Sequence, residues 1–207
     1  MYTLNFKNGL IKIAATFLLV TSCIYFSCNQ KKNYKEPTVK IETNYGDIIV
    51  ELYPEKAPKT VATFLLYVDS GYYKNGSFYR VLKAEDQPSG TFKSDLIQGG
   101  IWQTKNKMQI KLPGIPHETT KQTGILHKDG TISMARLEPG TASSEFFIVI
   151  GDQPAYDYGG DANADGQGFA AFGAVFKGIN IVRKIQEQPA SGESFVEKIR
   201  IDKIKRL

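Results

Sequence analysis

One stretch, residues 131–151 (TISMARLEPGTASSEFFIVIG), constrains the fold more than any other part of the chain. Ile132–Arg136 is predicted to be a strand that reaches a turn at Glu138-Pro139-Gly140. Phe146–Ile150 is an unbroken run of aromatic and β-branched residues, which indicates a buried strand. Two such strands joined by a polar loop form the centre of a β-protein. Because the ends of these strands are rigid and partly open to solvent, we expect a site there.

The segments on either side predict two helices and further short strands. After Pro58, the apolar residues Val61, Phe64, Leu65 and Val68 recur with helical spacing, so we expect an amphipathic helix that ends at Gly71. A second helix is predicted at 180–188, and strands at 39–52 (a hairpin turning at Tyr45-Gly46-Asp47), 78–82, 96–101, 169–176 and 196–204. Exposed loops are predicted at 84–95 and 152–168, and a turn-rich segment at 105–124. Many short strands with two helices favour an antiparallel barrel or sandwich.

The net charge of +5 is concentrated at the N-terminus. Residues 1–38 contain five lysines and one glutamate, so the remainder, with 21 basic and 20 acidic residues, has a balance of +1. A domain so close to neutral lacks the basic surface that nucleic acid requires. We therefore expect no nucleic-acid partner.

The first 28 residues have the layout of a secretory signal. Lys7 and Lys12 precede the apolar run Ile13–Val20, which is shorter than the ~20 residues of a membrane-spanning helix. Val20-Thr21-Ser22-Cys23 resembles a bacterial lipoprotein signal, in which the cysteine becomes the lipidated mature N-terminus. The change to polar sequence after Cys28 favours Cys28 as the lipidated residue instead. The sequence leaves open which of the two is lipidated. An uncleaved anchor and a secreted form are the alternatives.

These features divide the chain into three parts. Residues 1–28 are the leader, 29–38 a polar tether, and 39–207 the folded domain. We expect a lipoprotein of the cell envelope that faces the periplasm and is attached to the membrane by its N-terminal lipid. Because the domain contains no cysteine, it has no internal disulfide and no thiolate metal site.

Several catalytic motifs are incomplete or missing. His117-Glu118 begins like HExxH, but Lys121 occupies the position of the second histidine, so we predict no zinc site. No GxSxG elbow, P-loop or dinucleotide-binding fingerprint is present. Asp161–Gly166 reproduces the opening of an EF-hand loop, but its twelfth position is Phe172 instead of glutamate. We favour an acidic turn there, with weak calcium binding as the alternative, and we expect no metal in the site and no cofactor.

Five segments together resemble the cyclophilin family of peptidyl-prolyl cis–trans isomerases. They are Phe78-Tyr79-Arg80, Gln98-Gly99-Gly100, Ser133–Arg136, Ser144–Ile148 and Phe169–Gly173, and their order and approximate spacing match from about Val39 to Leu207. The resemblance implies a mainly β fold, a closed eight-stranded antiparallel barrel capped by two α-helices, with the substrate on an outer face.

The implied reaction needs no nucleophile, base or metal. Rotation about an X–Pro bond is opposed by amide resonance, with a barrier of ~18–20 kcal/mol, although the two isomers differ by only ~0.5–1 kcal/mol. A donor aimed at the prolyl nitrogen, beside an apolar pocket for the ring, binds the twisted state better than either planar state.

By this resemblance, Arg80 is the donor, and Gln98 either binds the substrate carbonyl or steers Arg80. Phe147 forms the floor of the proline pocket, with Leu96 and Phe169 as walls. Ala135 and Arg136 flank the residue before proline through their backbone, and Glu145 belongs to the same binding surface. Three of these positions depart from the family pattern: Glu145 replaces a common glutamine, Arg136 a common asparagine and Phe169 a common histidine. An aromatic residue usual just before the glutamine is replaced by Asp95, and Phe92 is a candidate substitute.

We therefore expect a monomeric peptidyl-prolyl isomerase that acts on proline-containing polypeptides during the folding of exported proteins. The alternative is a proline-binding chaperone or scaffold that keeps the groove but has little turnover.

Overall fold

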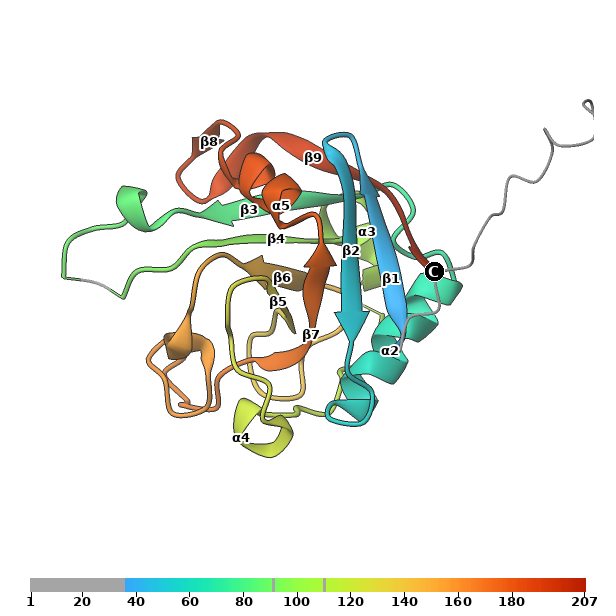
Figure 1. Ribbon diagram of the computed structural model, residues 1–207, viewed down its shortest axis with the longest axis horizontal. Helices are drawn as coiled ribbons and strands as arrows, with labels where there is room; N and C mark the ends of the chain where they lie inside the picture. The colour runs from blue at the N-terminus through green and yellow to red at the C-terminus, as the bar shows by residue number, and fades with distance from the viewer. Residues whose placement is uncertain (1–35, 91, 110) are drawn as a thin grey trace, which may run out of the picture. The chain divides into compact units, whose positions relative to one another are not determined.

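The computed structural model describes residues 36–90, 92–109 and 111–207 (Figure 1). The leader, most of the tether and both candidate lipidation sites, Cys23 and Cys28, lie outside the described residues. Within the described ranges, no helix has both the length and the apolar composition needed to cross a bilayer.

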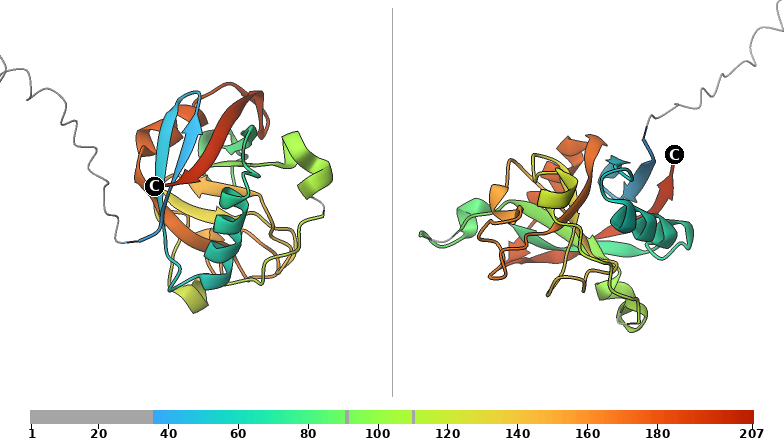
Figure 2. Two further views of the ribbon diagram at one scale, coloured as in Figure 1. Left: turned by 90° about the vertical axis from the view of Figure 1, so that its right-hand side faces the viewer. Right: turned by 90° about the horizontal axis from the view of Figure 1, so that it is seen from below.

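The described chain forms a barrel of antiparallel strands (Figures 1 and 2). The strands are β1 (Thr38–Thr43), β2 (Gly46–Leu52), β3 (Gly76–Leu82), β4 (Leu96–Gly100), β5 (Thr131–Met134), β6 (Phe146–Val149), β7 (Ala170–Lys177), β8 (Ala190–Ser191) and β9 (Ser194–Arg206). They pair in the order β1-β2-β7-β5-β6-β4-β3-β9, and β9 pairs again with β1. Eight strands therefore close the barrel, as predicted, while the short β8 pairs with β9.

Two helices form where the sequence predicts them, α2 (Pro58–Asp69) and α5 (Ile179–Gln186). Gly71, in the left-handed conformation, ends α2: its N–H donates to Val68 O, and the N–H of Tyr72 donates to Tyr67 O. The apolar faces of both helices enter the core through Phe64 and Val182, among other side chains. α2 lies beside the C-terminal end of β9, where Asp69 pairs with Arg206 (Figures 1 and 2).

Two short helices that the predictions do not include are α3 (Trp102–Gln109), which begins just before the segment predicted as turn-rich, and α4 (Thr120–Thr123), which lies within it. Tertiary and capping contacts hold them instead of an apolar stripe. Glu145 accepts hydrogen bonds from the first N–H groups of α3, and Thr119 forms a capping box with Gln122 at the start of α4. Two single 3₁₀ turns, η2 (Ala84–Asp86) and η3 (Pro154–Tyr156), lie in the predicted loops.

Strand β6 is buried on both faces. Phe146 and Ile148 point into the barrel core, whereas Phe147 and Val149 belong to a second apolar cluster on the outer face. A strand covered on both sides has no polar alternation, which explains the unbroken apolar run in the sequence. The outer cluster is where the candidate site lies.

Candidate active site

Strand register places the three central site residues in one row. Arg80 of β3 is opposite Gln98 of β4, and Gln98 is opposite Phe147 of β6. Residues directly opposite each other in antiparallel neighbours point to the same face of the sheet. The guanidinium, the amide and the phenyl ring therefore project together from the outer face of the barrel, as the resemblance implies.

An apolar cluster, at the place of the predicted proline pocket, surrounds Phe147. A second row on the same face consists of Leu82, Leu96 and Val149, which are buried with Phe147 and Tyr156. Phe169 meets the Phe147 ring edge-on at 5.2 Å between centroids, and Tyr156 lies 5.4 Å from it. The structure thus brings together Phe147, the predicted floor of the proline pocket, and its two predicted walls, Leu96 and Phe169.

Tyr156 is a pocket residue that the sequence reasoning missed. Phe92, the candidate substitute from the long loop, lies 5.6 Å from the Tyr156 ring, with 39% of its surface exposed. The long loop between β3 and β4 therefore carries an aromatic ring to the outer side of this cluster.

Arg80 is held on two sides. Its Nη1 donates to Gln98 Oε1 at 2.9 Å and its Nε donates to Glu193 Oε2 at 2.8 Å, while Nη2 lies 2.7 Å from the same carboxylate oxygen as an ion pair. A guanidinium has five N–H donors. At least two of them, one on each terminal nitrogen, bind no described residue and are available to a ligand.

Gln98 is oriented by a chain of hydrogen bonds that starts at Glu145. The Tyr79 hydroxyl donates to Glu145 Oε2 at 2.8 Å and accepts from Gln98 Nε2 at 3.1 Å. Because a carboxylate can only accept, Tyr79 must donate to it, and this leaves the hydroxyl oxygen for the amide nitrogen. The amide oxygen of Gln98 then faces Arg80. Gln98 thus contacts Arg80 directly, which is the arrangement that steering of Arg80, one of its two predicted roles, requires.

Glu145 is a buried carboxylate with a full set of donors. Its Oε1 accepts from the backbone N–H groups of Ile101 and Trp102, at 2.8 and 3.0 Å, and from the Ser144 hydroxyl at 3.1 Å. Burial raises the pKa of Glu145, against the opposing effect of these hydrogen bonds. Burial also raises the pKa of Tyr79, so its hydroxyl stays neutral. Glu145 therefore acts on the site through Tyr79.

The two glycines after Gln98 make room for this arrangement. A Cβ at Gly100, whose φ is +152°, would lie 2.5 Å from the Glu145 carboxylate, and one at Gly99 would lie 2.5 Å from Ser77 O. The Gln-Gly-Gly sequence is thus required by the close approach of Glu145 and β3.

Comparison with known proteins identifies the family. The family described as "Cyclophilin type peptidyl-prolyl cis-trans isomerase/CLD" matches residues 38–206. The chain belongs to the cyclophilin family. This cyclophilin is 34% identical over 154 residues to a peptidyl-prolyl cis-trans isomerase of Acinetobacter baylyi, with 74% of the chain and 73% of the relative covered. It is 32% identical to peptidyl-prolyl cis-trans isomerase B of Escherichia coli, over 72% of the chain and 83% of the relative.

Solved structures agree. A cyclophilin type peptidyl-prolyl cis-trans isomerase of Cryptosporidium parvum superposes with a TM-score of 0.64 at 25% identity, covering 83% of this chain and 97% of that one. The same protein has been crystallised in the presence of the dipeptide Ala-Pro, and that structure gives a TM-score of 0.63 at 26% identity. This cyclophilin is accordingly a peptidyl-prolyl cis–trans isomerase.

The Arg136 side chain of this cyclophilin has no free N–H donor for a ligand. Its five N–H donors are all used: Nε and Nη2 bind Gly168 O, Nη1 binds Leu137 O, and the two terminal nitrogens bind the Asp165 carboxylate. The side chain is completely buried and lies over the Phe169 ring at 5.3 Å. Ala135 and Arg136 both border the hollow beside Gln98, and Ala135 N donates to Glu145 O.

His127 supports the pocket from behind. Its ring is parallel to Phe147 at 6.0 Å between centroids, and its nitrogens contact Asp157 Oδ1 at 2.7 Å and Ser133 Oγ at 3.0 Å. This Ser-His-Asp order resembles a hydrolase triad, but Ser133 is fully buried and no substrate reaches it. His127 is therefore a hydrogen-bonded structural histidine.

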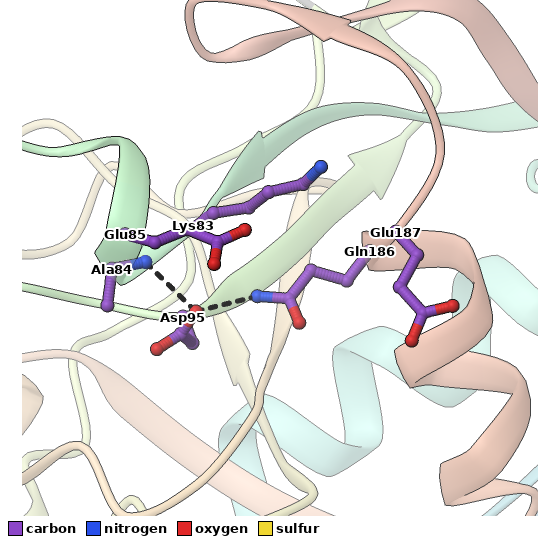
Figure 3. A pocket seen from close by; sticks show the side chains of 6 residues that line it. All are labelled: Lys83, Ala84, Glu85, Asp95, Gln186 and Glu187. Carbon is purple, nitrogen blue, oxygen red and sulfur yellow. Dashed lines mark hydrogen bonds between the residues drawn. The ribbon is translucent and has the colours of Figure 1, made fainter.

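Two hollows flank the cyclophilin site. One, of about 460 Å³, adjoins Gln98 and is bordered by Trp102, Ala135, Leu137 and Glu145, among others. The other, of about 410 Å³, lies between the end of β3 and the end of α5 (Figure 3). There Asp95 Oδ1 accepts from Ala84 N and Gln186 Nε2, so its carboxylate fastens the long loop to α5 (Figure 3). Among the described residues, no group of three or more acidic, histidine or cysteine side chains could hold a metal ion.

Sequence reasoning missed Tyr79, Tyr156 and Glu193. Tyr79 was visible only as the neighbour of Arg80, and Tyr156 as an aromatic residue in a loop. Nothing in the sequence around Glu193 indicates that it reaches Arg80, 113 positions away.

Proposed function

We propose that this cyclophilin lowers the barrier to X–Pro rotation with Arg80 as donor to the prolyl nitrogen and the Phe147 pocket as the seat of the proline ring. The observation that carries the proposal is the row Arg80–Gln98–Phe147 on one face of the barrel, with two free N–H groups on the guanidinium.

The chemistry follows from the loss of amide conjugation. As the X–Pro bond twists, the prolyl nitrogen regains its lone pair and becomes a hydrogen-bond acceptor. Arg80 remains charged at any physiological pH and donates from a planar fork, so it stabilises the twisted state without a proton transfer. Each ~1.36 kcal/mol of extra binding in that state accelerates rotation tenfold.

The test compares Arg80→Ala and Arg80→Lys with the wild type in proline-limited refolding and in peptide exchange measured by NMR. Removing a donor that acts in the transition state is expected to lower the rate by roughly 100-fold. Lysine should restore little of the rate, because it lacks the planar guanidinium with its several N–H donors. Peptide binding, followed by NMR titration, should change far less. Equal rates in the wild type and Arg80→Ala would instead support the alternative, a proline-binding chaperone or scaffold with little turnover.

We further propose that the substrates are exported polypeptides and that the protein is a monomer anchored in the cell envelope, facing the periplasm, by a lipid on Cys23 or Cys28. The leader sequence supports this proposal. Fractionation of cells that express Cys23→Ala, Cys28→Ala or the double variant tests it, with fatty-acid labelling as the direct readout. Release of one single variant from the membrane identifies the lipidated cysteine. Membrane retention of the double variant would contradict lipid anchoring. Light scattering measures the molar mass of the detergent-solubilised protein and so tests whether it is a monomer.

A further inference from the structure

Glu193 stands at the edge of the site, on an element far from it in sequence. It lies in the turn between β8 and β9, and its carbonyl oxygen accepts from Val81 N at 2.8 Å. The next residue, Ser194, is opposite Arg80 in the pairing of β9 with β3. The turn is therefore fixed to the strand that carries Arg80, directly beside that residue.

The Glu193 carboxylate binds the side of the guanidinium that Gln98 leaves free. One oxygen, Oε2, accepts a hydrogen bond from Nε of Arg80 and lies 2.7 Å from Nη2 in an ion pair, while Gln98 binds Nη1. Because Nε takes part in this contact, the carboxylate restricts rotation of the guanidinium about the side-chain bonds next to Nε. A contact with Gln98 alone would hold one terminal nitrogen and would leave the orientation of the guanidinium plane undetermined.

The contact is exposed enough that its direct electrostatic energy is small. The Arg80 and Glu193 side chains are 38% and 60% exposed, and exposed ion pairs contribute little to stability. Its effect is instead geometric, because a flexible arginine side chain must otherwise be ordered each time a substrate reaches the twisted state.

We propose that Glu193 is a positioning residue for Arg80: it fixes the plane of the guanidinium so that the two remaining N–H groups face the proline. The proposal rests on the role of Arg80 as donor, proposed above. No part of the family resemblance assigns a role to this turn.

The experiment compares Glu193→Ala, Glu193→Gln and Glu197→Ala in the full-length protein. Glutamine retains an oxygen that can accept from Nε but carries no charge. Glu197→Ala is the matched control: it removes the same charge from β9, four residues after Glu193, and Glu197 is exposed and takes part in none of the ion pairs between described residues.

Glu193→Ala is expected to lower kcat for a proline peptide by roughly three- to fivefold while its Kd changes by less than about twofold. Glu193→Gln should recover most of the rate, and Glu197→Ala should match the wild type. The Nε–H resonance of Arg80 in spectra of ¹⁵N-arginine protein should lose its protection from solvent exchange in Glu193→Ala only. Melting curves verify that each variant folds.

An unchanged or faster rate in Glu193→Ala, with Arg80→Ala impaired, would overturn the role of Glu193 and leave that of Arg80 intact. A glutamine variant as slow as the alanine variant would also overturn it, because the effect would then be one of charge. Unimpaired Arg80→Ala would overturn the proposed function itself.

Discussion

Both carboxylate oxygens of Asp165 accept hydrogen bonds from the guanidinium of Arg136, at 2.7 and 2.9 Å. The Arg136 side chain is fully buried and also lies over Phe169, so this pair links the Asp/Gly-rich loop to a predicted wall of the proline pocket. The acidic loop, whose sequence resembles part of a calcium site, thus binds the positive charge of Arg136 through Asp165.

Asp165→Asn is expected to destabilise the protein in a way that depends on pH. The hydrogen bonds from Arg136 lower the pKa of Asp165 to about 2 from its ordinary 3.8. A carboxyl with a lowered pKa adds stability above its unfolded value, and that stability is lost as the pH falls toward the folded value. The advantage of the wild type over Asp165→Asn in the free energy of unfolding should be full above pH 4 and shrink between about pH 4 and 2. Asp161→Asn, in the same loop, is the control, and an advantage that does not vary with pH would contradict the assignment.

Calcium is expected to leave the melting temperature unchanged. A calcium loop needs free carboxylate oxygens and a carboxylate at its twelfth position. The Asp165 oxygens are bound to Arg136, and Phe172, at the twelfth position, is buried in the barrel core. Thermal melts with added CaCl₂ and with EDTA test this, and a higher melting temperature in calcium would show that the loop does bind the ion.

Tyr79→Phe should slow isomerisation while leaving the fold intact. The change removes the hydroxyl that sets the direction of the Gln98 amide, so the amide can turn its nitrogen toward Arg80 and repel it. A net hydrogen bond of about 1 kcal/mol predicts a rate roughly fivefold lower. Exchange NMR of a proline peptide measures the rate. Tyr45→Phe, which removes a hydroxyl bound to Gln188 outside the site, is the matched control and should keep the wild-type rate.

Glu145→Gln should show the opposite pH trend to Asp165→Asn. Burial raises the pKa of Glu145 above its ordinary 4.5, so the folded state binds this proton more tightly than the unfolded state. The contribution of Glu145 to stability is therefore complete below pH 4.5 and declines as the pH rises through the raised pKa. Denaturant unfolding of both proteins from acidic to neutral pH should show that the free energy of unfolding of the wild type falls relative to that of Glu145→Gln as the pH rises. If it rises instead, the hydrogen bonds to Glu145 affect its pKa more than burial does.

The isomerisation rate should be nearly constant between about pH 6 and 8, because neither an arginine nor a glutamine titrates there. His127 is the histidine nearest the pocket floor, and its two nitrogens already contact Asp157 and Ser133. A pH–rate profile by peptide exchange tests this. A steep change that disappears in His127→Gln would show that the pocket responds to this histidine after all.

The local elements of this cyclophilin follow closely from the sequence. The apolar run at 146–150, the helical spacing after Pro58 and the hairpin predicted at 39–52 each correspond to an element that the structure contains, although the hairpin turns at Asn44-Tyr45, one residue earlier than predicted, and Gly46 and Asp47 belong to β2. Closure of eight strands was implied by the family resemblance and is confirmed. The helices α3 and α4 could not be predicted, because a buried carboxylate and a capping box hold them where no apolar period exists.

The sequence, through the family resemblance, determined the candidates for the chemistry: an arginine, a glutamine and an aromatic floor, each on a strand recognisable from its own neighbours. Only the tertiary structure decided how these groups are held. It bound the Arg136 guanidinium to Asp165, linked Glu145 to Gln98 through Tyr79, and placed Glu193 against Arg80. The physical reason is that strand propensity and apolar period act over a few residues. A hydrogen bond between side chains of distant strands depends instead on the register with which the barrel closes.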